Sequence, residues 1–537
     1  MCKSLVGSAG QLLFSFEDRI QSQQPNAELS QPLPQDERSR RVMILLAIAS
    51  VLATFPVWLA TYPPMVDLPQ HMAQVAILRN LRDPAFRFAG LFEVNWFTPY
   101  LLGYMAVYVL TPVVGIVAAS KVVISVALAG LPMATGLLMK EVGGDSYWAL
   151  LTIPTMYGFT YEWGFLNFLI AVPVGLFFLL LVIRTTRKPI LRSCILLGLF
   201  AVLLFFCHAL ICIFLGFIAC VYMLVEIGNV KKTILTTMPM ASVVPLAVAW
   251  YLRTKSHPAT QDAILWDLGW LHSAGSDSLG GRLTGFFPRL LGLEGDVICF
   301  AVGTVLFALS LLGGARPTRR MVLWMPFVTC LCVLLFCPTS AFGTDFIYQR
   351  FVVFALPFFL LGASRAGGVR PAWRAVVVFV IIGWMALLAA RTLRYDTDAR
   401  GFTNILSGME PNQRVLSLMF VPLTESIPAP VFLHYPAWYS ATKKGIVDVS
   451  FALCYPELVV YEPSKIPRAQ IGFELSPETF EWAKLNGSDY RYFVVRAPAN
   501  LGFQLFRGAP CGVSLAARSQ DWWLYEKDPH CSPATTF

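Results

Sequence analysis

The feature that most constrains this chain is a series of long apolar runs separated by short polar segments. A helix needs about 20 apolar residues to cross the hydrocarbon core of a bilayer. Nine runs reach or approach that length: 42–60, 163–183, 190–206, 209–226, 233–252, 296–314, 321–338, 350–364 and 374–391. The pattern predicts a polytopic membrane protein.

Composition supports this prediction and sets aside one alternative. The chain is 56% hydrophobic and 14% charged, whereas soluble domains carry about 25% charged residues. Its formal net charge of +9 would suggest nucleic-acid binding in a soluble protein. Here the lysines and arginines gather between the apolar runs, which is the charge bias of cytoplasmic membrane loops. We therefore expect membrane lipids, and no nucleic acid, as partners.

Basic clusters predict the orientation of the runs. They lie at 184–192, 231–232, 316–320 and 365–374, and we place them on the cytoplasmic side. Residues 1–38 are polar and end in a basic stretch, which predicts a disordered cytoplasmic segment before an uncleaved first helix. The chain is thus expected to be a multi-pass protein of the inner (cytoplasmic) membrane.

Alternating crossings then place four parts of the chain outside: 61–97, 253–295, 339–350 and all residues after Arg391. One region does not fit simple alternation. Residues 98–139 and 147–183 are each long enough for two crossings, but two complete hairpins would put the basic segment 184–192 outside. We expect one of them to cross once and to hold a re-entrant or interfacial piece, with the break YGFTYEWGF on the outer face.

The chain changes character after the last run. Strand-like stretches rich in β-branched and aromatic residues occur at 415–420, 457–462, 491–497 and 522–527, and ETFEWAKLN (478–486) looks helical. Beyond the segment 1–38, we predict an all-α transmembrane domain of about 11–13 helices over 39–391, with the outer loop 61–97. A small extracytoplasmic α/β domain over 392–537 follows it.

Two features of this tail bear on its surroundings. Outside the cytoplasm, a pair such as Cys511 and Cys531 can form a disulfide. His434 lies in the stretch HYPAWYSATKKG, which we interpret as a surface connection from a strand to a loop.

The segment YPPMVDLPQH places a carboxylate and an imidazole just after the first apolar run. Its two leading prolines end the first membrane helix. An amphipathic helix follows, with Gln74 on the side facing water. Asp67 is then held at the outer membrane face beside an interfacial helix, with His71 four residues further on. Two interpretations stay open: Asp67 is a functional carboxylate, or it caps this helix.

Other polar residues interrupt or border apolar runs. Glu162 lies among aromatic residues in YGFTYEWGF, as a functional site near membrane depth or in an ordinary interfacial loop. His208 interrupts a run, where a lone histidine is more often a packing residue than a ligand. Arg350 starts a run and suits either snorkelling to headgroups or binding a phosphate. Arg253 and Lys255 add positive charge to another outer loop.

Several of these stretches carry a family resemblance. DLPQH on the first outer loop, together with YEWGFLNFLIAVP, FFCHALICIFLGF and YQRFVVFALPFFLL, resembles the GT-C class of integral-membrane glycosyltransferases and the uncharacterised bacterial membrane proteins grouped with it. The resemblance covers roughly residues 40–391. The tail is similar in arrangement only, as a small extracytoplasmic domain after the last helix.

The resemblance implies a reaction and roles for these residues. The donor would be a sugar on a polyprenyl phosphate, and Asp67 would be the catalytic carboxylate, assisted by Glu162. Arg350, helped by Arg253 or Lys255, would contact the phosphate of the donor. Glu162 and His208 would orient the acceptor or tune Asp67, and His71, four residues further on, would hydrogen-bond Asp67 if that stretch is helical. Leu68 stands where the family often has a second acid. Whether Asp67 acts as a base or holds a divalent cation, Mg²⁺ or Mn²⁺, stays open.

A non-enzymatic protein is the alternative. It would be a transporter or flippase for a lipid-linked glycan, or a catalytically degenerate GT-C-like assembly protein. A transporter is expected to show inverted repeats and ionisable residues near mid-membrane. The chain shows no sustained repeat, and its ionisable residues lie near the predicted outer face. This pattern favours an enzyme working at one leaflet.

Overall fold

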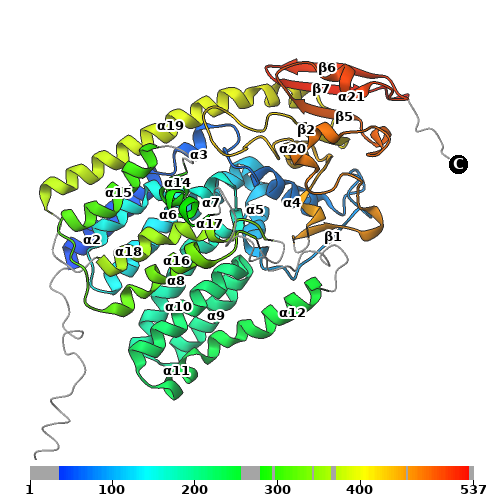
Figure 1. Cartoon of the computed structure of the whole chain (residues 1–537). Helices are drawn as coiled ribbons and strands as arrows, with labels where there is room; N and C mark the ends of the chain where they lie inside the picture. The colour runs from blue at the N-terminus through cyan, green and yellow to red at the C-terminus, as the bar shows by residue number, and fades with distance from the viewer. Residues whose placement is uncertain are drawn as a thin grey trace, which may run out of the picture.

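The computed structural model describes residues 36–255, 278–292, 297–340, 344–363, 370–454 and 457–530. Figure 1 shows a helical body with a small sheet at one end, formed by the C-terminal part of the chain. The predicted arrangement of a mostly helical chain with a sheet region near the C-terminus is confirmed.

Each predicted apolar span is helical. The longest helices are α6 (Ile116–Glu141), α8 (Leu166–Arg187), α10 (Ala209–Ile227) and α19 (Pro371–Gly408). The other helices of these spans are α2 (Asp36–Leu52), α3 (Pro56–Leu59), α9 (Leu191–Cys207), α11 (Val230–Thr237), α12 (Val243–Lys255), α15 (Val297–Leu312), α16 (Met325–Phe336), α17 (Ile347–Phe351) and α18 (Ala355–Ala363). Within the described residues, six helical segments are long and apolar enough to cross a membrane: Ser39–Leu59, Ile116–Glu141, Leu166–Arg187, Ala209–Ile227, Val230–Thr254 and Pro371–Gly408.

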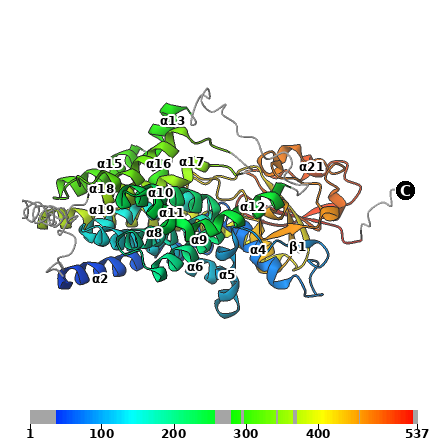
Figure 2. The ribbon, with the colours of Figure 1, turned by 90° about the horizontal axis from the view of Figure 1, so that it is seen from below.

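The region 98–183, whose number of crossings the sequence leaves open, has two long helices in its first half and one in its second. Its first half holds α5 (Leu101–Val114) and α6, which are separated by Gly115 at φ 79°. Glycine adopts this backbone conformation without steric cost, so the chain turns sharply, and in Figure 2 α5 leaves the body at a steep angle to its neighbours. The second half begins with 3₁₀ turns at Ser146–Thr152 and Pro154–Tyr157. They lead through the short α7 (Phe159–Glu162) into α8.

The C-terminal sheet has five strands in the order β3-β2-β5-β7-β6. The strands are β2 (Arg414–Met419), β3 (Ile446–Asp448), β5 (Tyr492–Arg496), β6 (Val513–Ser519) and β7 (Trp522–Lys527). β2 pairs in parallel with β3 and β5, and β7 lies antiparallel between β5 and β6. The strands predicted at 415–420, 491–497 and 522–527 are confirmed.

Residues 457–462 and 478–486 lie outside the five-stranded sheet. The stretch 457–462 does form a strand, β4 (Val459–Tyr461), but it pairs with β1 (Phe92–Val94) of the first loop in a separate two-stranded sheet. The predicted helix at 478–486 is wrong, because the chain forms only a 3₁₀ turn at Pro477–Thr479 followed by turns. Asn486 has φ 52°, and a left-handed residue of this kind ends a helical path.

The boundary predicted at residue 391 falls inside a continuous helix. α19 runs through it to Gly408, and it packs against β6 and β7 of the C-terminal sheet. Phe402 contacts Trp522 with ring centroids 5.1 Å apart. Asp396 accepts a hydrogen bond of 2.6 Å from the backbone of Thr61 in the first loop. The helix therefore joins the helical body, the first loop and the sheet.

The helix after Asp67 is not an interfacial helix. α4 (Leu68–Asn80) is buried from Leu68 to Ile77 and packs against α20 (Ala437–Lys443). Gln74, which was predicted to face water, is buried. Its Nε2 donates to the carbonyl of Val459 at 2.9 Å, and its Oε1 accepts from the Val459 backbone N–H at 2.6 Å. The polar face of α4 thus binds backbone of the C-terminal domain.

Replacing Gln74 with leucine is expected to destabilise the protein strongly. The change keeps the size of the side chain but leaves the buried N–H and C=O of Val459 without partners. We expect the free energy of unfolding to fall by about 2–4 kcal/mol, measured as a shift in the denaturant midpoint of the purified protein. Gln413→Leu, which removes only an exposed bond to Pro411, serves as the control. Equal midpoints for the two variants would contradict this account.

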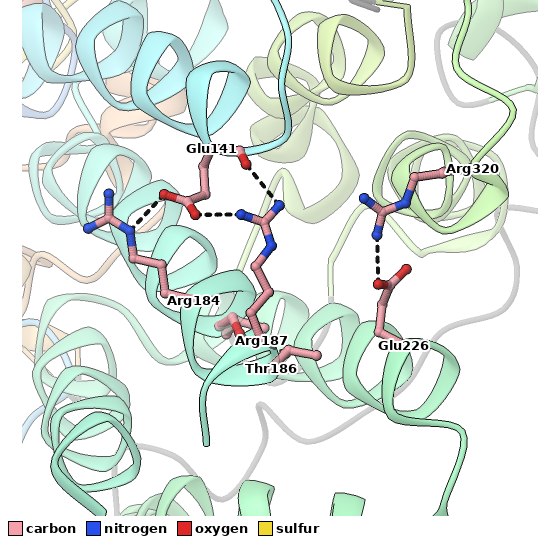
Figure 3. Close-up of polar contacts among 7 residues, drawn as sticks. Glu141, Arg184, Thr186, Arg187, Glu226 and Arg320 are labelled. Carbon is pink, nitrogen blue, oxygen red and sulfur yellow. Dashed lines mark hydrogen bonds and ion pairs between the residues drawn. The ribbon is translucent and has the colours of Figure 1, made fainter. Parts of the chain in front are cut away.

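Charged residues at one end of the helical body form two ion-pair groups (Figure 3). Glu141, at the end of α6, pairs with Arg184 at 2.8 Å and with Arg187 at 2.7 Å. Glu226, near the end of α10, pairs with Arg320 at 2.6 Å. The arginines belong to the basic clusters 184–192 and 316–320, which predict the orientation in the membrane. Figure 3 shows these two clusters, distant in the sequence, in the same region of the structure.

Candidate functional site

Asp67 is the last residue before α4, and its carboxylate does not cap that helix. The N-cap position of α4 is Asp67, yet its side chain accepts no capping hydrogen bond. The side chain is only 11% exposed. Its Oδ1 lies 3.5 Å from Nε2 of His434. Of the two interpretations open from sequence, helix capping is therefore the one that the geometry does not support.

The backbone around Asp67 is fixed by the YGFTYEWGF segment. The N–H of Val66 donates to the carbonyl of Glu162, and that of Asp67 donates to the carbonyl of Trp163, both at 3.0 Å. Gly164 follows with φ 78°, and a Cβ there would lie 2.8 Å from the backbone nitrogen of Asp67. The two stretches predicted to share the outer face therefore lie in direct contact.

The electrostatic surroundings of Asp67 are unusual for an aspartate. Burial raises the pKa of its carboxyl to about 8, the positive charge of Arg350 opposes that rise, and the carboxylates of Glu457 and Glu474 add to it. A carboxyl that titrates near neutral pH is suited to proton transfer. Groups perturbed in this way concentrate at functional sites.

Arg350 lies on α17 beside an aromatic cluster. Its guanidinium stacks over the ring of Phe165 at 3.6 Å, and its Nε donates to the carbonyl of Asp345 at 3.1 Å. Trp163 and Phe346 lie next to this ring, with centroids 4.3 Å apart. The stacking holds the guanidinium plane in place while its charge acts on Asp67.

His71 belongs to a hydrogen-bonded chain that ends on a carboxylate of the C-terminal domain. Its Nδ1 lies 2.7 Å from the hydroxyl of Tyr104, and that hydroxyl donates to Oε2 of Glu457. Burial raises the pKa of Glu457 to about 7, against the effects of Tyr104 and Arg350. Burial lowers the pKa of His71 to about 3, so this imidazole is neutral.

Sequence reasoning missed Glu457 and misjudged His434. Nothing in the sequence distinguishes Glu457 from other acids that precede a strand. The surface connection predicted around His434 is wrong, because His434, Trp438 and Tyr439 are all buried. Trp438 stacks on Tyr62 at 4.4 Å, which seats this segment on the first loop. Burial also lowers the pKa of His434 to about 4.

The carboxylate of Glu162 lies beside Arg391. Its Oε1 lies 3.9 Å from Nη2 of Arg391, and both residues border a cavity of about 20 Å³, which has room for a single water molecule. The charges that act on Asp67 are those of Arg350, Glu457 and Glu474. Glu162 contributes its backbone carbonyl to the surroundings of Asp67, while its carboxylate is paired with Arg391.

Of the other predicted site residues, His208 lies near the Arg350 side chain and Arg253 does not act on Asp67. His208 lies between α9 and α10, and its ring meets Tyr100 at 5.1 Å and Phe168 at 5.0 Å. It is within electrostatic reach of Arg350. Arg253 is exposed near the end of α12 and is not among the charges that act on Asp67. The side chain of Lys255 lies outside the described residues.

The residues around Asp67 do not suit a divalent cation. In the parts of the chain that the structure describes, no group of three or more His, Cys, Asp or Glu side chains is arranged to hold a metal ion. Mg²⁺ needs near-octahedral oxygen coordination, whereas the side chain 3.5 Å from the Asp67 carboxylate is an imidazole and the charge of Arg350 that acts on Asp67 is positive. We therefore assign no metal to this site.

The arrangement can do two things chemically. A buried carboxyl with a pKa near neutrality can accept a proton, and a fixed guanidinium can offset negative charge on a phosphate. Asp67 contacts His434 of the C-terminal domain and lies within electrostatic reach of Glu457 and of Arg350, which is 283 positions away in the sequence. No protein-family model and no curated protein matches this chain. A proposal for its function therefore depends on the geometry described above.

Proposed function

We propose that the chain is an integral-membrane glycosyltransferase of the GT-C type, which transfers a sugar from a polyprenyl-phosphate donor to an acceptor hydroxyl. The observation that carries the proposal is the buried Asp67 carboxyl under the positive charge of Arg350. One group suits removal of a proton from the acceptor, and the other suits the phosphate that leaves.

The transfer proceeds as a displacement at the anomeric carbon. Asp67, in its ionised form, takes the proton of the acceptor hydroxyl, and the acceptor oxygen forms a bond to the anomeric carbon. The bond from that carbon to the phosphate oxygen breaks, and its electron pair leaves on polyprenyl phosphate. Arg350 offsets the negative charge that grows on this oxygen, which is the kind of electrostatic contribution that dominates many enzymatic rate enhancements.

An apolar groove provides a place for the lipid tail of the donor. The groove has a volume of about 480 Å³ and is lined by Leu283, Phe286, Phe307, Leu331, Leu334 and Phe359. Its wall connects to the Arg350 helix: Arg282 donates to the carbonyl of Leu334 at 3.1 Å. Arg282 also stacks on Tyr348 at 4.0 Å, two residues before Arg350. Apolar lining of this kind suits polyprenyl units.

Two observations support the proposed orientation, with the site at the outer face of the inner membrane. The basic residues of the Glu141 and Glu226 ion-pair groups (Figure 3) belong to two of the clusters that the positive-inside rule assigns to the cytoplasmic side. Cys511 in the C-terminal domain is disulfide-bonded, which is typical of a domain outside the cytoplasm. The predicted partner, Cys531, lies outside the described residues.

The proposal is tested by transfer of a radiolabelled sugar from synthetic polyprenyl-phosphate donors to cell-envelope acceptors, with purified protein in lipid vesicles. We expect a labelled product that requires the wild-type protein. Movement of the intact labelled donor between leaflets, without transfer, would instead identify a transporter and contradict the proposal.

Gly164→Ala is expected to reduce transfer by about 100-fold, because displacing a catalytic group by about 1 Å costs a factor of this size. The added Cβ would lie 2.8 Å from the nitrogen of Asp67, at φ 78°, so the Asp67 backbone must move. Gly90→Ala is the matched control, since Gly90 has φ 73° and no atom within 4 Å of the added Cβ. Equal losses in the two variants would show that backbone strain alone, rather than displacement of Asp67, causes the effect.

A further inference from the structure

The C-terminal domain reaches the Asp67 site with two side chains. His434 lies just before α20, and Glu457 lies just before β4. Both segments are tied to the first loop. Gln70 donates to the carbonyl of Val449 at 2.8 Å, and the backbone of Asn95 donates to that of Leu458 at 2.7 Å. The domain is therefore fixed against the residues that carry Asp67 and His71.

The His434 ring is held where it contacts Asp67. It packs edge-on against Phe451 with centroids 5.4 Å apart, and Phe451 packs edge-on against His71 at 5.5 Å. Nε2 of His434 lies 3.5 Å from Oδ1 of Asp67. A neutral imidazole carries one N–H. With that proton on Nε2, the ring places an N–H donor 3.5 Å from Oδ1.

Glu457 is connected to His71 rather than to Asp67. Tyr104 lies between them, with its oxygen 2.7 Å from Nδ1 of His71 and its proton directed to Glu457. When Glu457 is ionised and accepts the hydrogen bond of the Tyr104 hydroxyl, the Tyr104 oxygen can in turn accept from an Nδ1–H of His71. The Gly164 backbone also hydrogen-bonds this ring, so Glu457, acting through Tyr104, and Gly164 together orient the imidazole, as hydrogen-bond partners do in other sites.

We propose that the C-terminal domain completes the Asp67 site with two positioning residues: His434, which orients the Asp67 carboxylate, and Glu457, which orients His71 through Tyr104. This inference rests on the proposed glycosyltransferase function. It makes the domain an integral part of the active site rather than a separate binding module.

The first test separates positioning from packing by the choice of substitution. His434→Leu removes the N–H donor, whereas His434→Gln places an amide N–H near the position of Nε2. We expect kcat to fall about 100-fold in His434→Leu with the donor KM within about threefold, and to recover at least about tenfold in His434→Gln. Equal kcat values in the leucine and glutamine variants, measured on folded protein, would overturn the role of His434.

The Glu457 arm is tested in the same assay. We expect Tyr104→Phe and Glu457→Leu each to lower kcat about tenfold, and the double variant to be no worse than either, because the residues act as one chain. Glu462→Gln and Tyr108→Phe are the controls, because they change a glutamate and a tyrosine that do not belong to the hydrogen-bonded chain His71–Tyr104–Glu457. If the losses in kcat of the two single variants add in the double variant, Glu457 does not act through Tyr104, and this part of the proposal is wrong.

A spectroscopic measurement separates this inference from the proposed function. The chain contains only six histidines, so ¹⁵N-histidine-labelled protein in vesicles gives few imidazole signals, which single His→Gln variants assign. We expect Asp67→Asn to shift the signals of His434, and Tyr104→Phe to shift those of His71. Unchanged signals would overturn the inference, whatever the transferase activity. Shifted signals in a protein that transfers no sugar would support these contacts and refute the proposed function instead.

Discussion

Replacing Asp67 with asparagine is expected to lower the rate of sugar transfer by at least about 1,000-fold, because a positioned general base contributes a factor of this order. Asparagine has nearly the same shape but cannot take the acceptor proton. The measurement is the single-turnover rate with radiolabelled donor in vesicles. Wild-type turnover in this variant would refute the assignment of Asp67 as the base.

The loss of rate is expected without a loss of stability. An unfolded aspartate ionises near pH 4, whereas the pKa of buried Asp67 is raised to about 8. The folded state therefore loses stability as the pH rises between these values, and asparagine removes that loss. We expect Asp67→Asn to unfold at or above the wild-type temperature at pH 7. Asp83→Asn, in the same loop but exposed, should leave the transfer rate unchanged.

The helical spans and most strands of the tail were predictable because their signals are local. A run of about 20 apolar residues needs a helix to satisfy its backbone in an apolar environment, whatever surrounds it. The helix that follows Asp67 shows the limit of such signals. Its pattern of apolar residues alternating with glutamines fits an interfacial helix as well as a buried one. Only the structure shows that Gln74 binds the backbone of Val459, 385 residues further along the chain.

The candidate site was predictable only in part, for the same reason. Asp67 and Arg350 stand out in sequence because each is an ionisable residue at the end of an apolar run. Glu162 stands out equally, but its carboxylate lies beside Arg391, a contact that no local pattern reveals. His434 and Glu457 lie in an ordinary α/β tail. Their role depends on how the tail folds back on the first loop, and that contact leaves no mark on the spacing of residues.

The pH dependence of the reaction is expected to change when Arg350 or Glu457 is replaced, and the two replacements should shift its midpoint in opposite directions. The profile of kcat/KM reflects the free enzyme, so the wild-type rate should rise with pH around the raised pKa of Asp67, about 8. Arg350 opposes that rise in pKa, and Glu457 adds to it. Arg350→Gln should therefore move the midpoint to higher pH, and Glu457→Gln should move it to lower pH, each by roughly one unit.

Arg350→Gln is also expected to lower the limiting kcat/KM at high pH by about 100- to 1,000-fold, because it removes the group that offsets charge on the leaving phosphate. Arg350→Lys separates the two effects. It keeps the positive charge, so the midpoint should stay near that of the wild type, but a lysine cannot bind two phosphate oxygens side by side, so the limiting rate should still fall. If the midpoint moves in the same direction in Arg350→Gln and Glu457→Gln, the group that titrates is not the Asp67 carboxyl.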